Sequence, residues 1–388
     1  MIPRNEMPYT YGDLVNSFFQ LGDATIAEQL QSRLADYFKV KYVFLLDNAR
    51  VGLYTILKAY NNPGEVIMSA YNCIVVPEAV TFAGYKPVFV DIESDTLNIT
   101  LDNIKKKITP DTRVIIATHL FGIPCQIDEL QEFGRENGFL VIEDAAPAMG
   151  AEFDGQLAGH FGDASVISFH SSKVIAGETG GALLTNDENL AERITEILNK
   201  LKIDRNNISL LYKAFVKKAV YHPWVYPVTF WGYKLLKNTS MYEVVLPTIQ
   251  EPEGFLRLSS RSSCSLILTQ INRLEWNLKR RRRIAEIYRD GLSNNDYFKS
   301  VRILENSVPS WIQFPIIADN KEGLFKYMMK NNIDLSWTYR YSCAESYHLD
   351  DCPNSHKAAK TVLGLPTYPT LTDQQAKRIC QIANAYNE

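Results

Sequence analysis

The chain has 388 residues, of which 46% are hydrophobic and 22% are charged. This composition is too apolar for a disordered protein and too mixed for a fibrous one, so it indicates a globular protein with a sizeable core. The formal net charge of −3 excludes a general electrostatic attraction to nucleic acid, because phosphate binding requires a concentrated excess of Lys and Arg.

The six cysteines are scattered and lack the paired spacing of a zinc site or of a disulfide framework. We therefore expect reduced thiols and no metal centre. The first residues lack the basic and apolar regions of a signal peptide, and no stretch reaches the ~20 apolar residues that span a bilayer. These features predict a cytoplasmic protein.

From residue 42 onward, short runs rich in β-branched residues alternate with segments of helical length. The alternation predicts an α/β fold with a mostly parallel sheet of about seven strands. The run 139–142 is apolar throughout, as expected for a strand that is covered on both faces. The predicted strands are 42–46, 65–68, 87–90, 113–118, 139–143, 164–169 and 181–185.

The alternation stops after Asn186, and residues of about 201–248 form a segment rich in aromatic residues and lysine, which we interpret as an insertion. A long helix is then predicted from Ser260 to Tyr288. It leads into a smaller C-terminal α/β domain. We expect a large domain at 1–250 and a small domain at 251–388, with a close interface because no low-complexity linker separates them.

Asp144 and Lys173 each follow one of the predicted strands. Because open α/β folds bind ligands at the carboxyl edge of the sheet, we expect both side chains to face one ligand. A lysine and an aspartate on either side of a cofactor are what pyridoxal phosphate requires. The amine forms a Schiff base with its aldehyde, and the carboxylate keeps the pyridine nitrogen protonated.

Three residues between the first predicted strand and its helix, Asn48, Ala49 and Arg50, form a candidate phosphate site. Free backbone N–H groups at the start of a helix attract anions. Ser168, five residues before Lys173, adds a hydroxyl. For Arg50 two interpretations stay open: an ion pair with a surface carboxylate, or a guanidinium that binds the phosphate.

Further motifs occur in a characteristic order along nearly the whole chain. They are Pro63-Gly64-Glu65-Val66-Ile67, Pro87-Val88-Phe89-Val90-Asp91, His119-Leu120-Phe121-Gly122, Ile142-Glu143-Asp144-Ala145-Ala146, Phe161-Gly162-Asp163, Ser168-Phe169-His170-Ser171-Ser172-Lys173 and Gly180-Gly181-Ala182. With these motifs the chain resembles the DegT/StrS family of sugar-nucleotide aminotransferases, which are pyridoxal-phosphate enzymes of fold type I.

The resemblance implies that Lys173 is the Schiff-base lysine and proton shuttle, and that Asp144 is the partner of the pyridinium nitrogen. It implies a phosphate site at Ser168 and the turn 48–50, and a cofactor contact at Cys73. The implied reaction moves an amino group from glutamate to a nucleotide-linked keto-sugar in the biosynthesis of surface polysaccharide or lipopolysaccharide. A homodimer is implied, in which each active site borrows residues from the second subunit.

Several positions depart from the family pattern, and all of them are accessory to the lysine and the aspartate. They leave two other hypotheses open: a pyridoxal-phosphate enzyme with another substrate or reaction, such as a dehydratase, and a non-catalytic module that binds a membrane surface. The retained Lys173 argues against the dehydratase branch in which histidine replaces that lysine. The departures are Asn72, Cys73, Pro147, Thr179, Arg50 and the segment 254–258.

Single residues of this set also have simpler interpretations. Asp144 alone is compatible with a helix cap, and Lys173 alone with a solvated surface lysine. His119 and His170 are interpreted as hydrogen-bonded side chains of the core or the site wall. The basic run 279–283 is interpreted as the solvated face of the long helix.

The segment from Leu210 to Lys237 contains fifteen consecutive uncharged residues, 219–233, with lysines on either side. Tyr and Trp with flanking lysines favour a membrane–water interface. One hypothesis is therefore a peripheral contact with the membrane. The alternative, which stays open, is that these aromatic residues are buried at a subunit interface or cover the active site.

Overall fold

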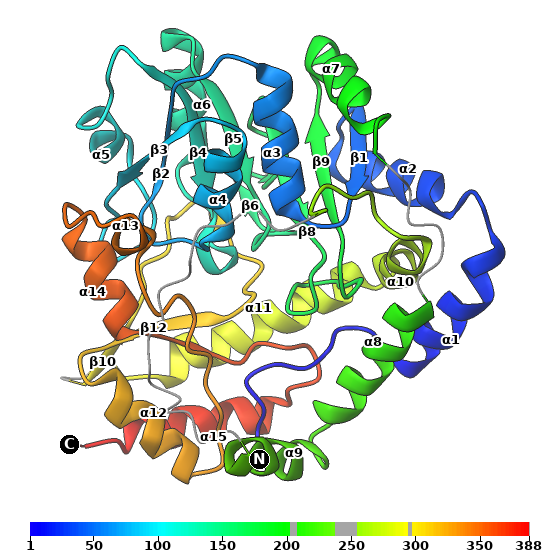
Figure 1. Ribbon diagram of the computed structural model, residues 1–388. Helices are drawn as coiled ribbons and strands as arrows, with labels where there is room; N and C mark the ends of the chain where they lie inside the picture. Colours follow the sequence, from blue (N-terminus) through cyan, green and yellow to red (C-terminus); the bar gives the residue numbers. More distant parts are fainter. Residues whose placement is uncertain (202–207, 237–253, 294–296, 388) are drawn as a thin grey trace.

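The computed structural model describes residues 1–201, 208–236, 254–293 and 297–387, and its centre is a seven-stranded sheet with the order β1-β9-β8-β5-β4-β2-β3 (Figure 1). Strand β9 runs antiparallel to both of its neighbours, and the other pairings are parallel. The predicted α/β fold with a mostly parallel sheet is confirmed. The strands are β1 (Tyr42–Leu46), β2 (Glu65–Ser69), β3 (Lys86–Val90), β4 (Thr112–Thr118), β5 (Leu140–Asp144), β8 (Ala164–Ser168) and β9 (Gly181–Thr185).

Helices cover both faces of this sheet because successive strand residues point to opposite sides. In β2, Val66 and Met68 pack into one core while Ile67 packs into another. The first core lies beneath α3 (Ala49–Tyr60), α4 (Val75–Phe82) and α7 (Glu188–Leu198). The opposite face is covered by α2 (Ile26–Phe38), α6 (Ile127–Asn137), α10 (Arg261–Ile271) and α11 (Leu274–Gly291).

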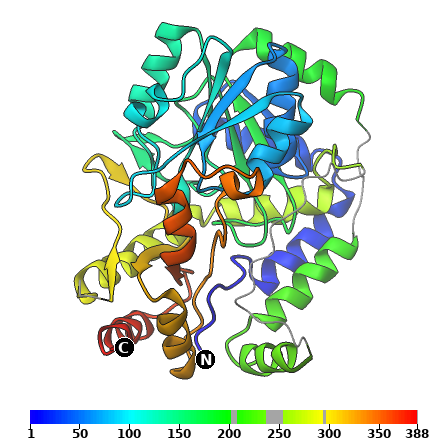
Figure 2. The same ribbon diagram turned by 60° about the vertical axis from the view of Figure 1, so that its left-hand side comes forward.

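A smaller antiparallel sheet follows in the chain, with the order β10-β12-β13 (Figures 1 and 2). Its strands are β10 (Phe298–Ser300), β12 (Phe314–Ala318) and β13 (Val362–Leu365), and its neighbours include α12 (Lys321–Lys330), α14 (Pro353–Thr361) and α15 (Asp373–Asn384). One hydrophobic core joins this sheet to residues of β4 and β5. The division at 250/251 stays a prediction, and α10, which follows it, packs against α1 (Tyr11–Phe19) and α2.

The predicted long helix from Ser260 to Tyr288 is two helices, α10 and α11, which are separated at Asn272 and Arg273. The Arg273 guanidinium forms an ion pair with Asp13 and donates a 3.0 Å hydrogen bond to the carbonyl of Pro8. These tertiary contacts accompany the break, which no glycine or proline marks in the sequence.

The interpretation of the run 279–283 as a solvated face is wrong for its central residue. Arg281 is only 1% exposed, and its Nε donates to Asn277 Oδ1 at 2.7 Å. Its Nη1 lies 3.3 Å from the carbonyl oxygen of Trp311. Burial lowers the pKa of Arg281 to about 10, so the guanidinium stays charged at neutral pH and depends on these acceptors.

We expect Arg281→Ala to lower the free energy of unfolding by about 3 kcal/mol, because it leaves buried acceptors without a donor and opens a cavity. The exposed neighbour Lys279 is the matched control, since Lys279→Ala removes a charge from the same helix without a buried partner. Urea unfolding followed by circular dichroism measures both. Equal midpoints for the two variants would contradict a structural role for Arg281.

Within the described residues, no helix has the length and apolar character needed to cross a membrane. All six cysteines are free thiols. The segment interpreted as an insertion contributes α8 (Ile208–Val220), α9 (Tyr226–Leu236) and the short connection 221–225 between them, whereas its residues 202–207 and 237–248, including Lys237, lie outside the described parts of the chain.

Candidate active site

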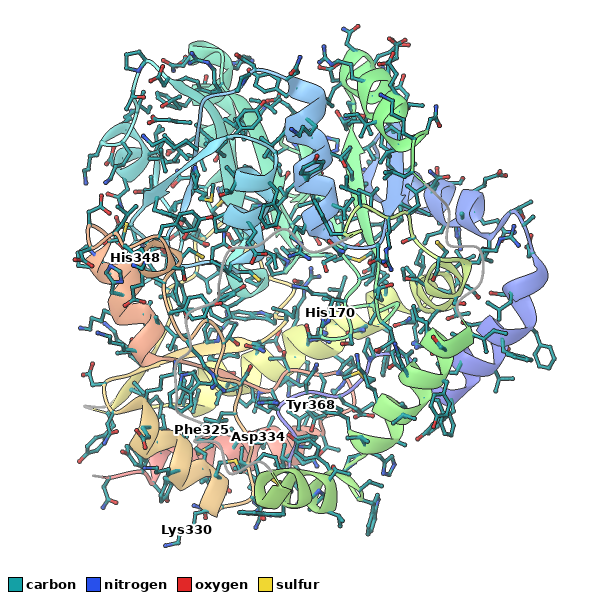
Figure 3. All side chains as sticks on the ribbon, viewed as in Figure 1. His170, Phe325, Lys330, Asp334, His348 and Tyr368 are labelled. Atoms are coloured by element: carbon teal, nitrogen blue, oxygen red, sulfur yellow. The ribbon has the colours of Figure 1, made fainter. Side chains whose placement is uncertain are left out.

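A cavity of about 470 Å³ lies at the carboxyl ends of the central strands. Every residue that the sequence assigned to the cofactor lines it: Asn48, Ala49, Arg50, Cys73, Asp144, Ser168 and Lys173. His170, labelled in Figure 3, and Pro147 also line it. The fold therefore brings the candidate residues together although they are spread over more than a hundred positions in the chain.

Asp144 is the last residue of β5, and its carboxylate accepts two hydrogen bonds. Thr118 Oγ1 donates to Oδ2 at 3.1 Å, and the N–H of Ala146 donates to Oδ1 at 3.1 Å. Asn72 Nδ2 in turn donates to Thr118 Oγ1 at 2.9 Å. Burial raises the pKa of Asp144, while these donors and Lys173 act in the opposite direction. No helix begins at Asp144, so the alternative of a helix cap is wrong.

Lys173 lies in the loop that leaves β8, where its N–H donates to the carbonyl of His170 at 2.9 Å. Its side chain lines the cavity, so the alternative of a solvated surface lysine is also wrong. Burial lowers the pKa of Lys173, and the nearby Cys73 and Asp144 partly oppose this shift. A lowered pKa increases the share of neutral amine at neutral pH, which is the nucleophilic form.

Four other parts of the chain hold the loop of Lys173. Gln270 of α10 exchanges two hydrogen bonds with the backbone of Ala176, at 2.7 and 3.2 Å. Asn277 of α11 donates to the carbonyl of Val174 at 2.7 Å. Near the end of the loop, Glu178 accepts a 2.6 Å hydrogen bond from the Tyr9 hydroxyl and forms an ion pair with Lys217 of α8. These anchors fix the backbone on which Lys173 stands.

The turn before α3 has the geometry of an anion site. Asn48 caps the helix, because its side chain accepts a hydrogen bond from the N–H of Val51 at 3.1 Å. The first N–H groups of the helix follow at Ala49 and Arg50. A Cβ on Gly181 would lie 2.7 Å from the Ala49 nitrogen, so only glycine lets β9 approach this turn.

Arg50 combines parts of both of its sequence interpretations. Its Nη1 donates to Glu78 Oε2 at 2.8 Å, but this pair lies at the cavity wall and Glu78 is buried. The guanidinium carbon lies 5.7 Å from the centre of the Phe255 ring. Its Nε is buried without a hydrogen-bond partner in the structure. A donor of this kind at a cavity wall can bind an anion.

His119 lies behind the site and does not line the cavity. Its Nε2 is 2.7 Å from Glu143 Oε1, and its Nδ1 accepts the N–H of Cys125 at 3.1 Å, which makes the ring neutral with Nε2 protonated. The predicted role as a core histidine agrees with these contacts. Leu258 pairs with Leu46 of β1, so the divergent segment 254–258 packs on its own chain.

Sequence reasoning missed the residues that enter the cavity from beyond residue 300. Tyr339 lines it with a left-handed backbone, φ 46°, and its ring lies 5.3 Å from that of Tyr71. Thr338 donates to Gln313 Oε1 at 2.7 Å, and both line the same wall. The cluster of aromatic residues and arginine at 337–341 is the one signal that could have drawn attention to this segment.

The fold and the cavity together define an α/β enzyme in which a half-buried lysine and a buried aspartate line one cavity at the edge of the sheet. The model of the DegT/DnrJ/EryC1/StrS aminotransferase family matches residues 13–209 and 255–384. The chain belongs to this family and is an aminotransferase.

Similar proteins cover nearly the same length. A dTDP-4-amino-4,6-dideoxy-D-glucose transaminase of Shigella dysenteriae is 27% identical, over 89% of this chain and 86% of its own. A GDP-perosamine synthase of Vibrio cholerae is 25% identical, over 99% of this chain and 96% of its own. The crystal structure of DesI with its TDP-sugar product has the same fold, with a TM-score of 0.78 at 23% identity over 99% of this chain and 93% of DesI.

The lowered pKa of Lys173 predicts selective modification by a small aldehyde. We expect formaldehyde with cyanoborohydride at neutral pH to methylate Lys173 before the exposed Lys279, because only the neutral amine attacks the aldehyde. Asp144→Asn should move the midpoint of Lys173 labelling to lower pH, since it removes a carboxylate that raises this pKa. Peptide mass spectrometry measures both sites. Labelling of Lys173 only at the pH of Lys279 would contradict the shift.

Proposed function

We propose that the protein transfers an amino group from glutamate to a nucleotide-linked keto-sugar with pyridoxal phosphate as cofactor. The observation that carries this proposal is the burial of Asp144 and Lys173 in one cavity that also includes a helix N-terminus. The names of similar proteins, a dTDP-aminosugar transaminase and a GDP-perosamine synthase, support the substrate class. Product sugars of this kind serve surface polysaccharide or other glycoconjugates.

The residues of the cavity fit this cofactor. A volume of about 470 Å³ lies within the usual range for ligand sites. The Ala49 and Arg50 amides and the unpaired Nε of Arg50 suit the phosphate, and Ser168 lines the same cavity. Lys173 suits the aldehyde and Asp144 the pyridine nitrogen. When bound, pyridoxal phosphate supplies an electron-accepting ring that stabilises negative charge on the substrate carbon.

The two buried groups have separate tasks in this proposal. Asp144 holds a proton at the ring nitrogen, and Thr118 and the N–H of Ala146 orient its carboxylate for that contact. With the cofactor bound, the Lys173 amine would carry a proton from the α-carbon of glutamate to C4′ of the cofactor, and in the second half-reaction from C4′ to the carbon of the keto-sugar. A lowered pKa suits this exchange, because it increases the share of neutral amine that can accept a proton.

The second hypothesis, a non-catalytic module, is disfavoured by the same observation. Withdrawing a carboxylate and an amine from water lowers the stability of the fold, and such a cost is typical of sites where a ligand or a reaction needs the two groups. A pyridoxal-phosphate enzyme with another reaction would share the cavity and differ in the substrate. The proposed assembly is a cytoplasmic homodimer.

The amino-donor half-reaction tests the proposal directly. We expect purified protein with added pyridoxal phosphate to develop a visible absorbance band that glutamate converts to the spectrum of the pyridoxamine form. Lys173→Ala should lose the band, and Lys279→Ala should keep it. Asp144→Asn should slow the glutamate-dependent change at least a hundredfold. A band that persists in Lys173→Ala, or that glutamate leaves unchanged, would exclude this function.

The Arg50–Glu78 pair allows a separate test of the phosphate site. We expect Arg50→Gln to weaken binding of pyridoxal phosphate about tenfold or more, because it removes a charged donor. Glu78→Gln releases the guanidinium from its partner and should leave binding unchanged or tighter. Absorbance titration with the cofactor measures both variants. Equal losses in the two variants would mean that Arg50 serves its ion pair and not the phosphate.

A further inference from the structure

Helices α1 and α8 carry apolar side chains on their outward faces, where a water-facing helix is normally polar. The exposed positions follow the spacing i, i+4, i+7, which places them on one side of each helix. On α1 they are Tyr11, Val15 and Phe18, followed by Phe19, which is 79% exposed. On α8 they are Ile208, Tyr212 and Phe215, followed by Val216.

A third helix repeats the pattern. Trp224, just before α9, is 86% exposed, and Val228 and Trp231 follow with the same spacing. Of the fifteen large hydrophobic side chains that are exposed in the described part of the chain, ten lie in these three helices and two more, Trp224 and Val225, directly precede α9. Scattered exposed apolar residues are common, but such a concentration marks an interaction site.

The outward residues of α1 and α8 form one surface. The rings of Tyr11 and Phe215 lie 5.5 Å apart, and both views show α1 and α8 side by side, with α9 beyond the end of α8 (Figures 1 and 2). The opposite side of α8 is already packed, because Leu210, Leu211 and Ala214 are buried in the protein. Helix α8 therefore has two apolar faces, of which one packs into the core and the other is exposed.

The charge of this region distinguishes between possible partners. Residues 206–242 contain five lysines and no Asp or Glu, in a chain with a net charge of −3, although Lys217 and Lys218 form ion pairs with glutamates from other parts of the protein. Lys213 is exposed on α8 between the apolar residues. Interfaces between protein subunits are depleted in lysine, whereas anionic lipid headgroups attract it, and Trp and Tyr favour the boundary between headgroups and acyl chains.

We propose that the surface of α1, α8 and α9 docks on a membrane that contains anionic lipids, with its aromatic residues in the headgroup region and Lys213 at the phosphates. This surface is separate from the aminotransferase cavity but close to its lysine loop. On the side opposite the exposed residues, Lys217 of α8 donates to Ser171 at 3.2 Å and forms an ion pair with Glu178. Docking therefore holds the cavity beside the membrane surface.

Co-sedimentation of the full chain with vesicles tests the proposal. We expect wild-type protein to pellet with phosphatidylcholine vesicles that contain phosphatidylglycerol, and to bind pure phosphatidylcholine less. Tyr212→Glu and Trp224→Glu should each lower the partition coefficient about tenfold or more. Trp276→Glu is the matched control, because it replaces another exposed tryptophan, on α11, with the same charge and should bind within about twofold of wild type.

Two further measurements separate lipid docking from an interface between subunits and from damage to the active site. Lys213→Gln should weaken binding to the anionic vesicles and leave binding to pure phosphatidylcholine unchanged. The variants should keep the glutamate-dependent spectral change, which separates this surface from the proposed function of the cavity. Wild-type protein that stays in the supernatant with both vesicles would overturn the proposal. So would loss of a dimer in Tyr212→Glu without any lipid binding, since the surface would then be an interface between copies.

Discussion

The site depends on keeping a carboxylate and an amine out of water within one cavity. Each charged group loses hydration on burial, and Asp144 and Lys173 offset that cost for each other only in part. Neither residue is held by the other. Asp144 is fixed by the donors Thr118 and the N–H of Ala146, and Lys173 by the backbone of its loop. The carboxylate and the amine can therefore each bind a ligand while these other contacts keep them in position.

The supports of the lysine loop extend far from the cavity. Arg281 donates a hydrogen bond to Asn277 Oδ1. The amide nitrogen of Asn277 in turn donates one to the carbonyl of Val174, which is next to Lys173. A buried arginine near the small sheet thus orients the residue that holds the loop of Lys173. On the other side, Tyr9 and Lys217 meet at Glu178. The loop thus contacts residues from the first helix region of the chain as well as residues that follow it in the sequence.

The sheet and the central residues of the site were predictable because their signals are local. Apolar runs of strand length marked all seven strands, and the rule that ligands bind at carboxyl ends brought Asp144 and Lys173 together. Thr118 was within reach of the same rule, since it pairs with Asp144 in the parallel register.

Other features depend on tertiary structure that the pattern does not encode. Arg281 has the helical spacing of the buried Leu278 and Tyr288, but an arginine in a run of five basic residues is normally exposed, and only the structure shows the acceptors that let it be buried. Tyr339 lines the cavity because its backbone is left-handed, and nothing in the neighbouring sequence predicts that conformation. The apolar stripe on α1 has the spacing of an ordinary buried helix face, and only the structure shows that it points outward.

The anchors of the lysine loop also have a consequence for the order of events during translation. Gln270 lies 94 residues after Ala176, and Asn277 lies 103 residues after Val174. At typical synthesis rates of about 5–20 residues per second, the loop is made roughly 5–20 s before its supports. The strands of the large sheet can pair during that interval while the lysine loop still lacks the partners that shape it.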